Sequence, residues 1–199
     1  MAFRYSFIKK IILIIEDLTW NLRCRKGLWL HGNYGLAKVI EKMPFYFIPK
    51  YLRKYGANIG KDCRIERGIN IHRPFGINKP FDKLTLGDNV YLGHQVLLDL
   101  TYPITFKNAS SCGSYGQLWT HASIYQGNTV ETKNYAEVYG EIIIDEGTFI
   151  FSNSVVRQGI HIGQFSNIGA CSLVNKDIHS FSSASGVPVK VVRRTSRKT

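Results

Sequence analysis

Aliphatic residues recur at every sixth position in several blocks of this 199-residue chain. The longest block takes five unbroken steps from Ile144 to Val174, and shorter blocks begin at Ile59, Leu86 and Phe106. A period of six matches neither the 3.6-residue turn of an α-helix nor the two-residue alternation of a single strand. It predicts a short strand followed by a tight turn, repeated many times along the chain.

Two further positions keep the same phase. The residue after the aliphatic one is often glycine, as at Gly60, Gly87, Gly93, Gly113, Gly163 and Gly169. The fifth position is small or β-branched, as at Cys63, Ile69, Val90, Val96, Ser110, Thr148, Ser154, Ile160, Ser166 and Ser172. We expect the glycines to supply the positive φ of the turns, and the aliphatic and small residues to point inward. Three such sides close a triangular coil, and the coils stack at about 4.8 Å, because one repeat cannot bury its apolar face alone.

This pattern resembles the hexapeptide-repeat acyltransferases over roughly residues 58 to 194, and the sugar and polysaccharide O-acetyltransferases among them, such as the galactoside and maltose enzymes. The resemblance implies a mainly β fold, a left-handed parallel β-helix, although the usual crossover rule favours the right hand. It also implies a homotrimer with the site between neighbours. A cytoplasmic location is expected from the scattered cysteines, which are interpreted as reduced thiols. Its activity would be transfer of an acetyl group from acetyl-CoA to a hydroxyl of a sugar or of a polysaccharide or glycolipid precursor.

Breaks in the period divide the chain. Residues 1–57 are expected to be a helical region, 58–180 the β-helix, and 181–199 a coenzyme-binding segment with a basic tail. The period is also interrupted at 72–84 and, most extensively, at 121–141. Long loops in compact folds are usually functional or disordered, so we expect 121–141 to be extruded beside a cleft.

The N-terminal region has apolar residues at helical spacing, namely Phe7, Ile11, Leu18 and Leu22. Further helices are expected at 35–43 and 49–55. The apolar run at 11–15 is too short for a signal-peptide core or a bilayer span. These helices either pack on the β-helix or a trimer neighbour, or lie at a membrane surface as a peripheral contact. Basic residues support the second alternative, namely Lys9, Lys10, Arg23, Arg25 and Lys26.

The chain carries a formal charge of +12, with 26 basic and 14 acidic residues, which favours anionic partners. Nucleic acid is not expected, because the basic residues are divided between the two ends and no nucleic-acid-binding module is recognisable. The four cysteines lack CxxC spacing, and no HxxxxH pair exists for zinc, so no metal is expected.

His121 lies in QLWTHAS, where the long insertion begins. The resemblance implies that it is the general base that takes the proton of the acceptor hydroxyl. The chemistry needs such a group, because a sugar hydroxyl is a poor nucleophile until its proton is removed. Imidazole titrates near about 6.5, and general-base assistance contributes about 10² to 10⁴ in rate.

Acceptor-binding residues are expected near this histidine. Asp99, in LLDLTYP, resembles an acidic residue that contacts acceptor hydroxyls in the family, and its alternative role is an Asx-turn that organises the loop. Trp119 and Tyr125 would stack on a sugar ring or pack the insertion. His94 is expected at a turn facing the cleft.

The C-terminal segment IGACSLVNKDIHSFSSASGVPVKVVRR resembles the donor-binding end of the family. The implied coenzyme A contacts are Gly169, Ala170, Asn175, Lys176, Pro188, Lys190 and Arg193. In this set the lysines and the arginine would bind phosphates, backbone N–H groups near Gly169 would bind the pantetheine arm, and Pro188 would lie near the adenine. Asn175 and Cys171 replace the usual Thr and Gly. The alternatives are N-acetyl transfer to an amino-sugar nucleotide, or a β-helix scaffold without activity.

Overall fold

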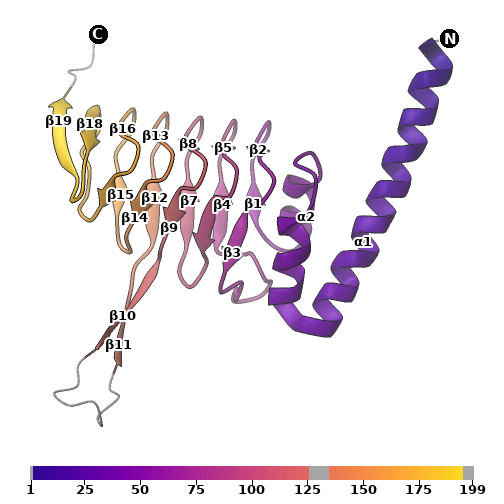
Figure 1. Cartoon of the computed structure of the whole chain (residues 1–199), viewed down its shortest axis with the longest axis horizontal. Helices are drawn as coiled ribbons and strands as arrows, with labels where there is room; N and C mark the ends of the chain where they lie inside the picture. Colours follow the sequence, from indigo (N-terminus) through magenta and orange to yellow (C-terminus); the bar gives the residue numbers. More distant parts are fainter. Residues whose placement is uncertain (1, 126–134, 195–199) are drawn as a thin grey trace.

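The computed structural model describes residues 2–125 and 135–194. Two helices at the N-terminal end precede a prism of short strands, and the described chain ends lie at opposite ends of the long axis (Figure 1). The expected left-handed parallel β-helix is confirmed.

Helix α1 spans Ala2–Glu41 and contains a break. His31 and Gly32 leave helical φ/ψ, and Gly32 takes a φ of 59°, so α1 consists of a first arm (residues 2–30) and a second arm (residues 33–41). Helix α2 spans Ile48–Lys54, with proline in its first turn. The helices expected from apolar spacing are therefore present.

The strands form three parallel sheets, because each strand pairs with the strand one coil further along the chain. The first sheet contains β1 (Asn58–Ile59), β4 (Leu84–Leu86), β7 (Ile104–Phe106), β12 (Ile142–Ile144) and β15 (His161–Ile162). The second contains β2 (Arg64–Ile65), β5 (Tyr91–Leu92), β8 (Ser111–Cys112), β13 (Phe149–Ile150), β16 (Asn167–Ile168), β18 (Ser182–Ser185) and the antiparallel β19 (Lys190–Arg194). The third contains β3 (Asn70–His72), β6 (Leu97–Asp99), β9 (Gln117–Leu118), β14 (Val155–Val156) and β17 (Leu173–Val174).

The core is the column of repeat residues predicted from the period of six. All of them are at most 7% exposed: Ile59, Ile65, Ile71, Leu86, Leu92, Leu98, Phe106, Cys112, Leu118, Ile144, Ile150, Val156, Ile162, Ile168 and Val174. The fifth-position residues are buried beside them, except for the half-buried Cys63. Their hydroxyls bond to corner carbonyls, as when Thr148 Oγ1 donates to Gly163 O at 2.9 Å and Ser154 Oγ to Gly169 O at 3.0 Å. Polar groups in the column are thereby satisfied.

The glycines after the aliphatic residues have a different purpose from the one expected. Positive φ occurs two positions after them, at residues such as Asp62, Asn89 and Gln95, so the prediction that these glycines supply it is wrong. They are needed because neighbouring coils approach closely. A Cβ on Gly93 would lie 2.5 Å from the backbone nitrogen of Ser114 in the next coil.

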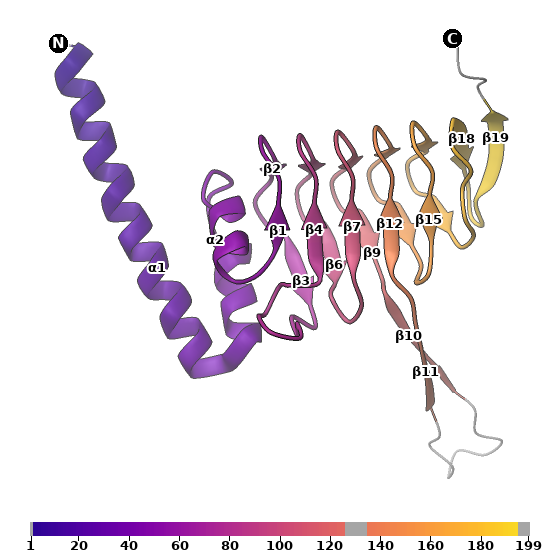
Figure 2. The same cartoon turned by 180° about the vertical axis from the view of Figure 1, so that it is seen from behind.

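The interruption at 121–141 contains an antiparallel hairpin that projects from the prism (Figures 1 and 2). Its strands are β10 (His121–Tyr125) and β11 (Tyr135–Tyr139); the tip lies outside the described residues. The base of the hairpin is held against the coils, since the Tyr102 and Tyr139 rings stack at 5.2 Å and Arg73 lies 3.6 Å from Glu137.

Replacing Gly93 with alanine is expected to lower the free energy of unfolding by about 1 to 3 kcal/mol, because the new Cβ meets backbone that cannot move aside. Urea unfolding measures the loss. The control is Gly159→Asn, since Gly159 has a φ of 73° with open space around its Cβ, and Asn153 takes φ 60° at the equivalent position one turn earlier. The control should change stability by less than about 1 kcal/mol. Equal losses in both variants would contradict this account of the glycines.

Candidate active site

A histidine and a buried carboxylate meet at the corner where the hairpin leaves the prism. Asp99 ends β6 and His121 begins β10. The Asp99 side chain is fully buried, whereas the His121 side chain keeps 11% exposure. His121 Nδ1 lies 2.5 Å from Asp99 Oδ2, which is a short charge-assisted hydrogen bond. The pair joins two segments that are 22 residues apart in sequence.

Asp99 is the centre of a dense hydrogen-bond network. Its Oδ2 accepts from the backbone N–H groups of Thr120 (2.9 Å) and His121 (3.0 Å), and its Oδ1 accepts from Thr101 N (3.2 Å) and Thr101 Oγ1 (2.7 Å). Burial acts to raise the pKa of Asp99, but hydrogen bonds from Thr101 and His121 outweigh it, and the pKa lies below its ordinary value. The group is therefore an anion at neutral pH.

This geometry gives Asp99 a positioning role. Both oxygens are occupied by protein donors and the side chain has no exposed surface, so it does not reach an acceptor as we expected. The Asx-type contact with Thr101 supports the alternative, in which Asp99 organises the turn.

The carboxylate also fixes the state of the histidine. When Nδ1 carries the proton that is donated to Asp99, Nε2 of His121 keeps its lone pair and can accept a proton. A neighbouring anion stabilises the imidazolium that then forms, as in other histidine–carboxylate pairs.

His72 is a residue of this cluster that the sequence did not point to. It ends β3, pairs in register with Asp99, and its ring stacks on His121 with centroids 5.6 Å apart and planes 9° apart. The edge of Trp119 completes the group, with its ring 5.6 Å from that of His72. Burial lowers the pKa of His72, and the charge of Asp99 opposes this only in part. A usable signal existed: His72 and Asp99 each directly follow an in-phase aliphatic residue.

One edge of the prism continues from this cluster toward the C-terminal end. The backbone N–H of Trp119 donates to Val156 O, and the backbone N–H of Arg157 donates to Val174 O, both at 3.0 Å. Trp119, Arg157 and Asn175 therefore occupy equivalent positions in three successive coils. Two coil spacings, about 10 Å, therefore separate the level of His121 from that of Lys176. Arg157 and Lys176 are both exposed on this edge. Arg157 was not among the site residues predicted from the sequence.

Comparison with known proteins gives the same architecture and a family. No family model matches the chain. The chain is 30% identical to the galactoside O-acetyltransferase of Escherichia coli (strain K12) over 75% of its own length and 58% of that protein. It is also 30% identical to WcaF of the same strain, a protein assigned to colanic acid biosynthesis as an acetyltransferase, over 71% of each. The chain belongs to the hexapeptide-repeat acetyltransferase family.

Solved structures share the fold of this chain at low sequence identity. A hexapeptide-repeat acetyltransferase from Vibrio cholerae, solved with acetyl coenzyme A, superposes with a TM-score of 0.70 at 19% identity, covering 83% of this chain and 86% of that one. A maltose O-acetyltransferase from Clostridium difficile 630 gives 0.69 at 19% identity, covering 87% and 85%. AntD, an N-acyltransferase from Bacillus cereus, gives 0.59 at 19% identity over 71% and 75%.

The residues expected to bind the donor lie on more than one part of the C-terminal end. Asn175 and Lys176 are exposed on the edge that carries His121, and Lys190 and Arg193 lie on β19. Pro188 follows a cis peptide bond and is exposed, as is Ala170. The N–H of Gly169 donates to Ala184 O at 2.8 Å, so it is engaged within the prism, and the prediction of a pantetheine contact from the backbone here is left with Ala170.

Two residues expected at the acceptor site lie elsewhere. His94 is exposed at another corner, 3.8 Å from Glu66, and lines a separate hollow with Arg67 and Gln95. Tyr125 lies at the outer end of β10, four residues and about 13 Å from His121, with its ring 5.6 Å from that of Tyr135. Trp119 is the one expected aromatic residue that adjoins His121.

The cluster also satisfies the distances of a metal site. One ligand atom from each of His72, Asp99 and His121 lies within 4.8 Å of the others. The hydrogen bonds argue for another use, because both Asp99 oxygens are already taken by Thr101, Thr120 and His121. The arrangement is better matched to holding and transferring a proton.

Replacing Asp99 with asparagine is expected to lower the free energy of unfolding at pH 7 by about 1 to 3 kcal/mol, because an amide NH₂ cannot accept from the donors around it. The pKa of Asp99 is depressed below 3.8, so its contribution is present above that value and is lost as the pH falls through the lower pKa of the folded state. The stability gap between wild type and variant should therefore narrow below about pH 4. Urea unfolding at pH 7 and at acid pH measures it; an unchanged gap would contradict the depressed pKa.

Proposed function

We propose that the protein is an acetyl-CoA-dependent O-acetyltransferase that acts on a sugar hydroxyl of a polysaccharide or glycolipid precursor. The observation that carries this proposal is the His121–Asp99 pair, which leaves one imidazole nitrogen able to accept a proton. The names of the relatives support the acceptor class, since they include a galactoside O-acetyltransferase and a protein assigned to colanic acid biosynthesis. The Vibrio cholerae neighbour, solved with acetyl coenzyme A, supports the donor.

The proposed reaction is direct transfer within a ternary complex. His121 Nε2 takes the hydroxyl proton while the oxygen attacks the thioester carbonyl, and Asp99 stabilises the imidazolium. A backbone N–H stabilises the oxyanion of the tetrahedral intermediate. The C–S bond then breaks, the ester C–O bond remains, and His121 returns the proton to the departing thiolate of coenzyme A. His72 and Trp119 enclose the imidazole and limit its rotation.

Basic side chains along the C-terminal half would bind the donor. The diphosphate and 3′-phosphate of coenzyme A favour Lys and Arg partners. Lys176, Lys190, Arg193 and the newly found Arg157 are exposed there. Of these, Arg157 and Lys176 lie on the edge that carries His121, so a donor lying along this edge would bring its thioester toward His121.

Replacing His121 with alanine is expected to lower turnover by at least about 10², with the affinity for acetyl-CoA unchanged, because the base acts only on the acceptor proton. The matched control is His161→Ala. His161 also pairs with a carboxylate, Asp145, at 2.8 Å, but it is half exposed and lies on β15. Near-normal turnover of His121→Ala would remove His121 as the base.

The same assay distinguishes the acceptor class. Free hydroxy-sugars and glycans are compared with amino-sugar nucleotides, each with acetyl-CoA as donor. Acetyl transfer to hydroxyl-only acceptors supports the proposal. Transfer only to acceptors that carry an amino group would instead favour N-acyl transfer, the activity in the name of AntD.

We further propose that the working unit is a homotrimer, in which a neighbour completes the cleft beside His121. Aromatic side chains exposed along the prism support an assembly: Tyr115, Phe149, Phe151 and Phe165 are 41 to 55% exposed. Light scattering should give three times the chain mass of 22.6 kDa. A monomeric mass together with full activity would contradict the shared cleft.

A further inference from the structure

The first arm of α1 carries an apolar stripe that no described part of the chain covers. Its residues recur at helical spacing and are 41 to 67% exposed: Ile8, Ile11, Ile12, Ile15, Leu18 and Leu22. Single exposed apolar residues are ordinary on protein surfaces, but a continuous stripe over four turns marks an interaction surface.

The opposite side of the same arm is the one that packs on the protein. The Asp17 carboxylate accepts a hydrogen bond from Lys50 Nζ at 2.5 Å, and the Asp17 backbone carbonyl accepts one from Tyr51 Oη at 2.7 Å. Asn21 accepts from Lys54, and Cys24 is fully buried. At 100° per residue these positions lie across the helix from the apolar stripe. Figure 1 shows that α2 lies between the first arm and the coils. Because the side of the arm that contacts α2 is opposite the stripe, the stripe is directed away from the prism.

The charges on this arm are asymmetric. Its two acidic side chains between residues 8 and 31 both accept hydrogen bonds from the α2 side, Glu16 from Tyr46 and Asp17 from Lys50. Arg25 and Lys26 continue the direction of the stripe, three and four residues beyond Leu22, and both are exposed. Beyond them Trp29 is 83% exposed. The outward surface thus combines apolar, cationic and tryptophan side chains.

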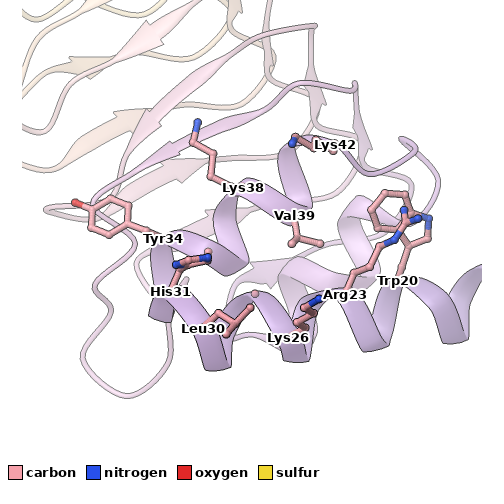
Figure 3. Close-up of a pocket in the computed structure, with 11 residues that line it drawn as sticks. Trp20, Arg23, Lys26, Leu30, His31, Tyr34, Lys38, Val39 and Lys42 are labelled. Carbon is pink, nitrogen blue, oxygen red and sulfur yellow. The ribbon is translucent and has the colours of Figure 1, made fainter.

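A groove of about 530 Å³ lies between the two arms of α1 (Figure 3). Leu30 and Val39 give it an apolar lining, and the cations at it are Arg23, Lys26, Lys38 and Lys42. A smaller hollow along the first arm shares Trp20 and Arg23 with this groove and extends it to Ile12 and Ile15. An apolar groove with cations at its edge suits a molecule that has both a phosphate and a hydrocarbon chain.

We propose that the first arm of α1 docks on an anionic phospholipid membrane, lying in the interface with its stripe against the acyl chains. The basic residues would contact lipid phosphates, and Trp29 would sit at headgroup level. Among the described residues, neither helix has the length and hydrophobicity of a transmembrane span. A second copy fits this surface less well. Pairing two such stripes in parallel brings Arg25 and Lys26 of one copy near those of the other, whereas the acids of the arm are already engaged.

The test is flotation of the full chain with vesicles of phosphatidylcholine alone or with added phosphatidylglycerol. Binding is expected to the anionic vesicles and to weaken with salt. Leu18→Glu should reduce bound protein at least about tenfold, because it places an anion in the stripe. Its matched control is Ile77→Glu, which makes the same change at a residue that is 85% exposed on a loop of the prism. The control should bind as wild type does.

A second pair of variants tests the cations. Arg25→Gln with Lys26→Gln should weaken binding to anionic vesicles by about tenfold, whereas Lys61→Gln with Arg67→Gln removes the same charge elsewhere and should have little effect. The proposal is overturned if wild type does not bind, or if the variant of each pair matches its control. It is also overturned if Leu18→Glu lowers the oligomeric mass while vesicle binding is unchanged, which would assign the stripe to a second copy. These readouts require no turnover, so they are independent of the proposed function.

Discussion

The stacking of each coil on the next is the constraint from which the rest of this structure follows. A two-residue strand has no stability alone, so every coil depends on burying its three inward aliphatic residues against those of its neighbours. Close approach of the coils then dictates glycine where backbone meets backbone, as at Gly93. Corners repeat at a fixed spacing, and a side chain on a corner is therefore held in register with those above and below it.

That rigidity explains how a carboxylate can remain ionised where water does not reach it. Asp99 is buried, which by itself favours the neutral acid, yet the corner presents backbone N–H groups of Thr101, Thr120 and His121 at fixed positions. Because these donors are held by the coils, the anion is stabilised without any rearrangement when His121 becomes charged. The site is thus a consequence of the repeat and of its longest interruption, since the hairpin begins at His121 itself.

The sequence predicted what depends on periodicity and missed what depends on contacts between coils. The buried column and the location of His121 could be predicted, because hydrophobic phase and a local motif are visible in the chain. Three features depend on which corner of one coil lies above which corner of the next: the purpose of the glycines, the role of Asp99 and the presence of His72 in the cluster. That register is set by the number of residues in each turn. The engaged N–H of Gly169 shows the same limit, since its acceptor, Ala184, lies in the next coil. His94 was misplaced because a turn position does not by itself reveal which of three corners it occupies.

The proposed membrane contact and the proposed reaction are linked by the distance between the first arm of α1 and His121. The first arm of α1 lies outside α2, which caps the first coil, and His121 follows the third coil. With helix layers about 10 Å apart and coils about 4.8 Å apart, His121 stands on the order of 30 Å from the surface on which α1 would lie. A hydroxyl on the sugar next to a lipid anchor could not reach it. If both proposals hold, the acceptor is a glycan extended by several sugars from its lipid, and the enzyme acts at the distal part of that chain.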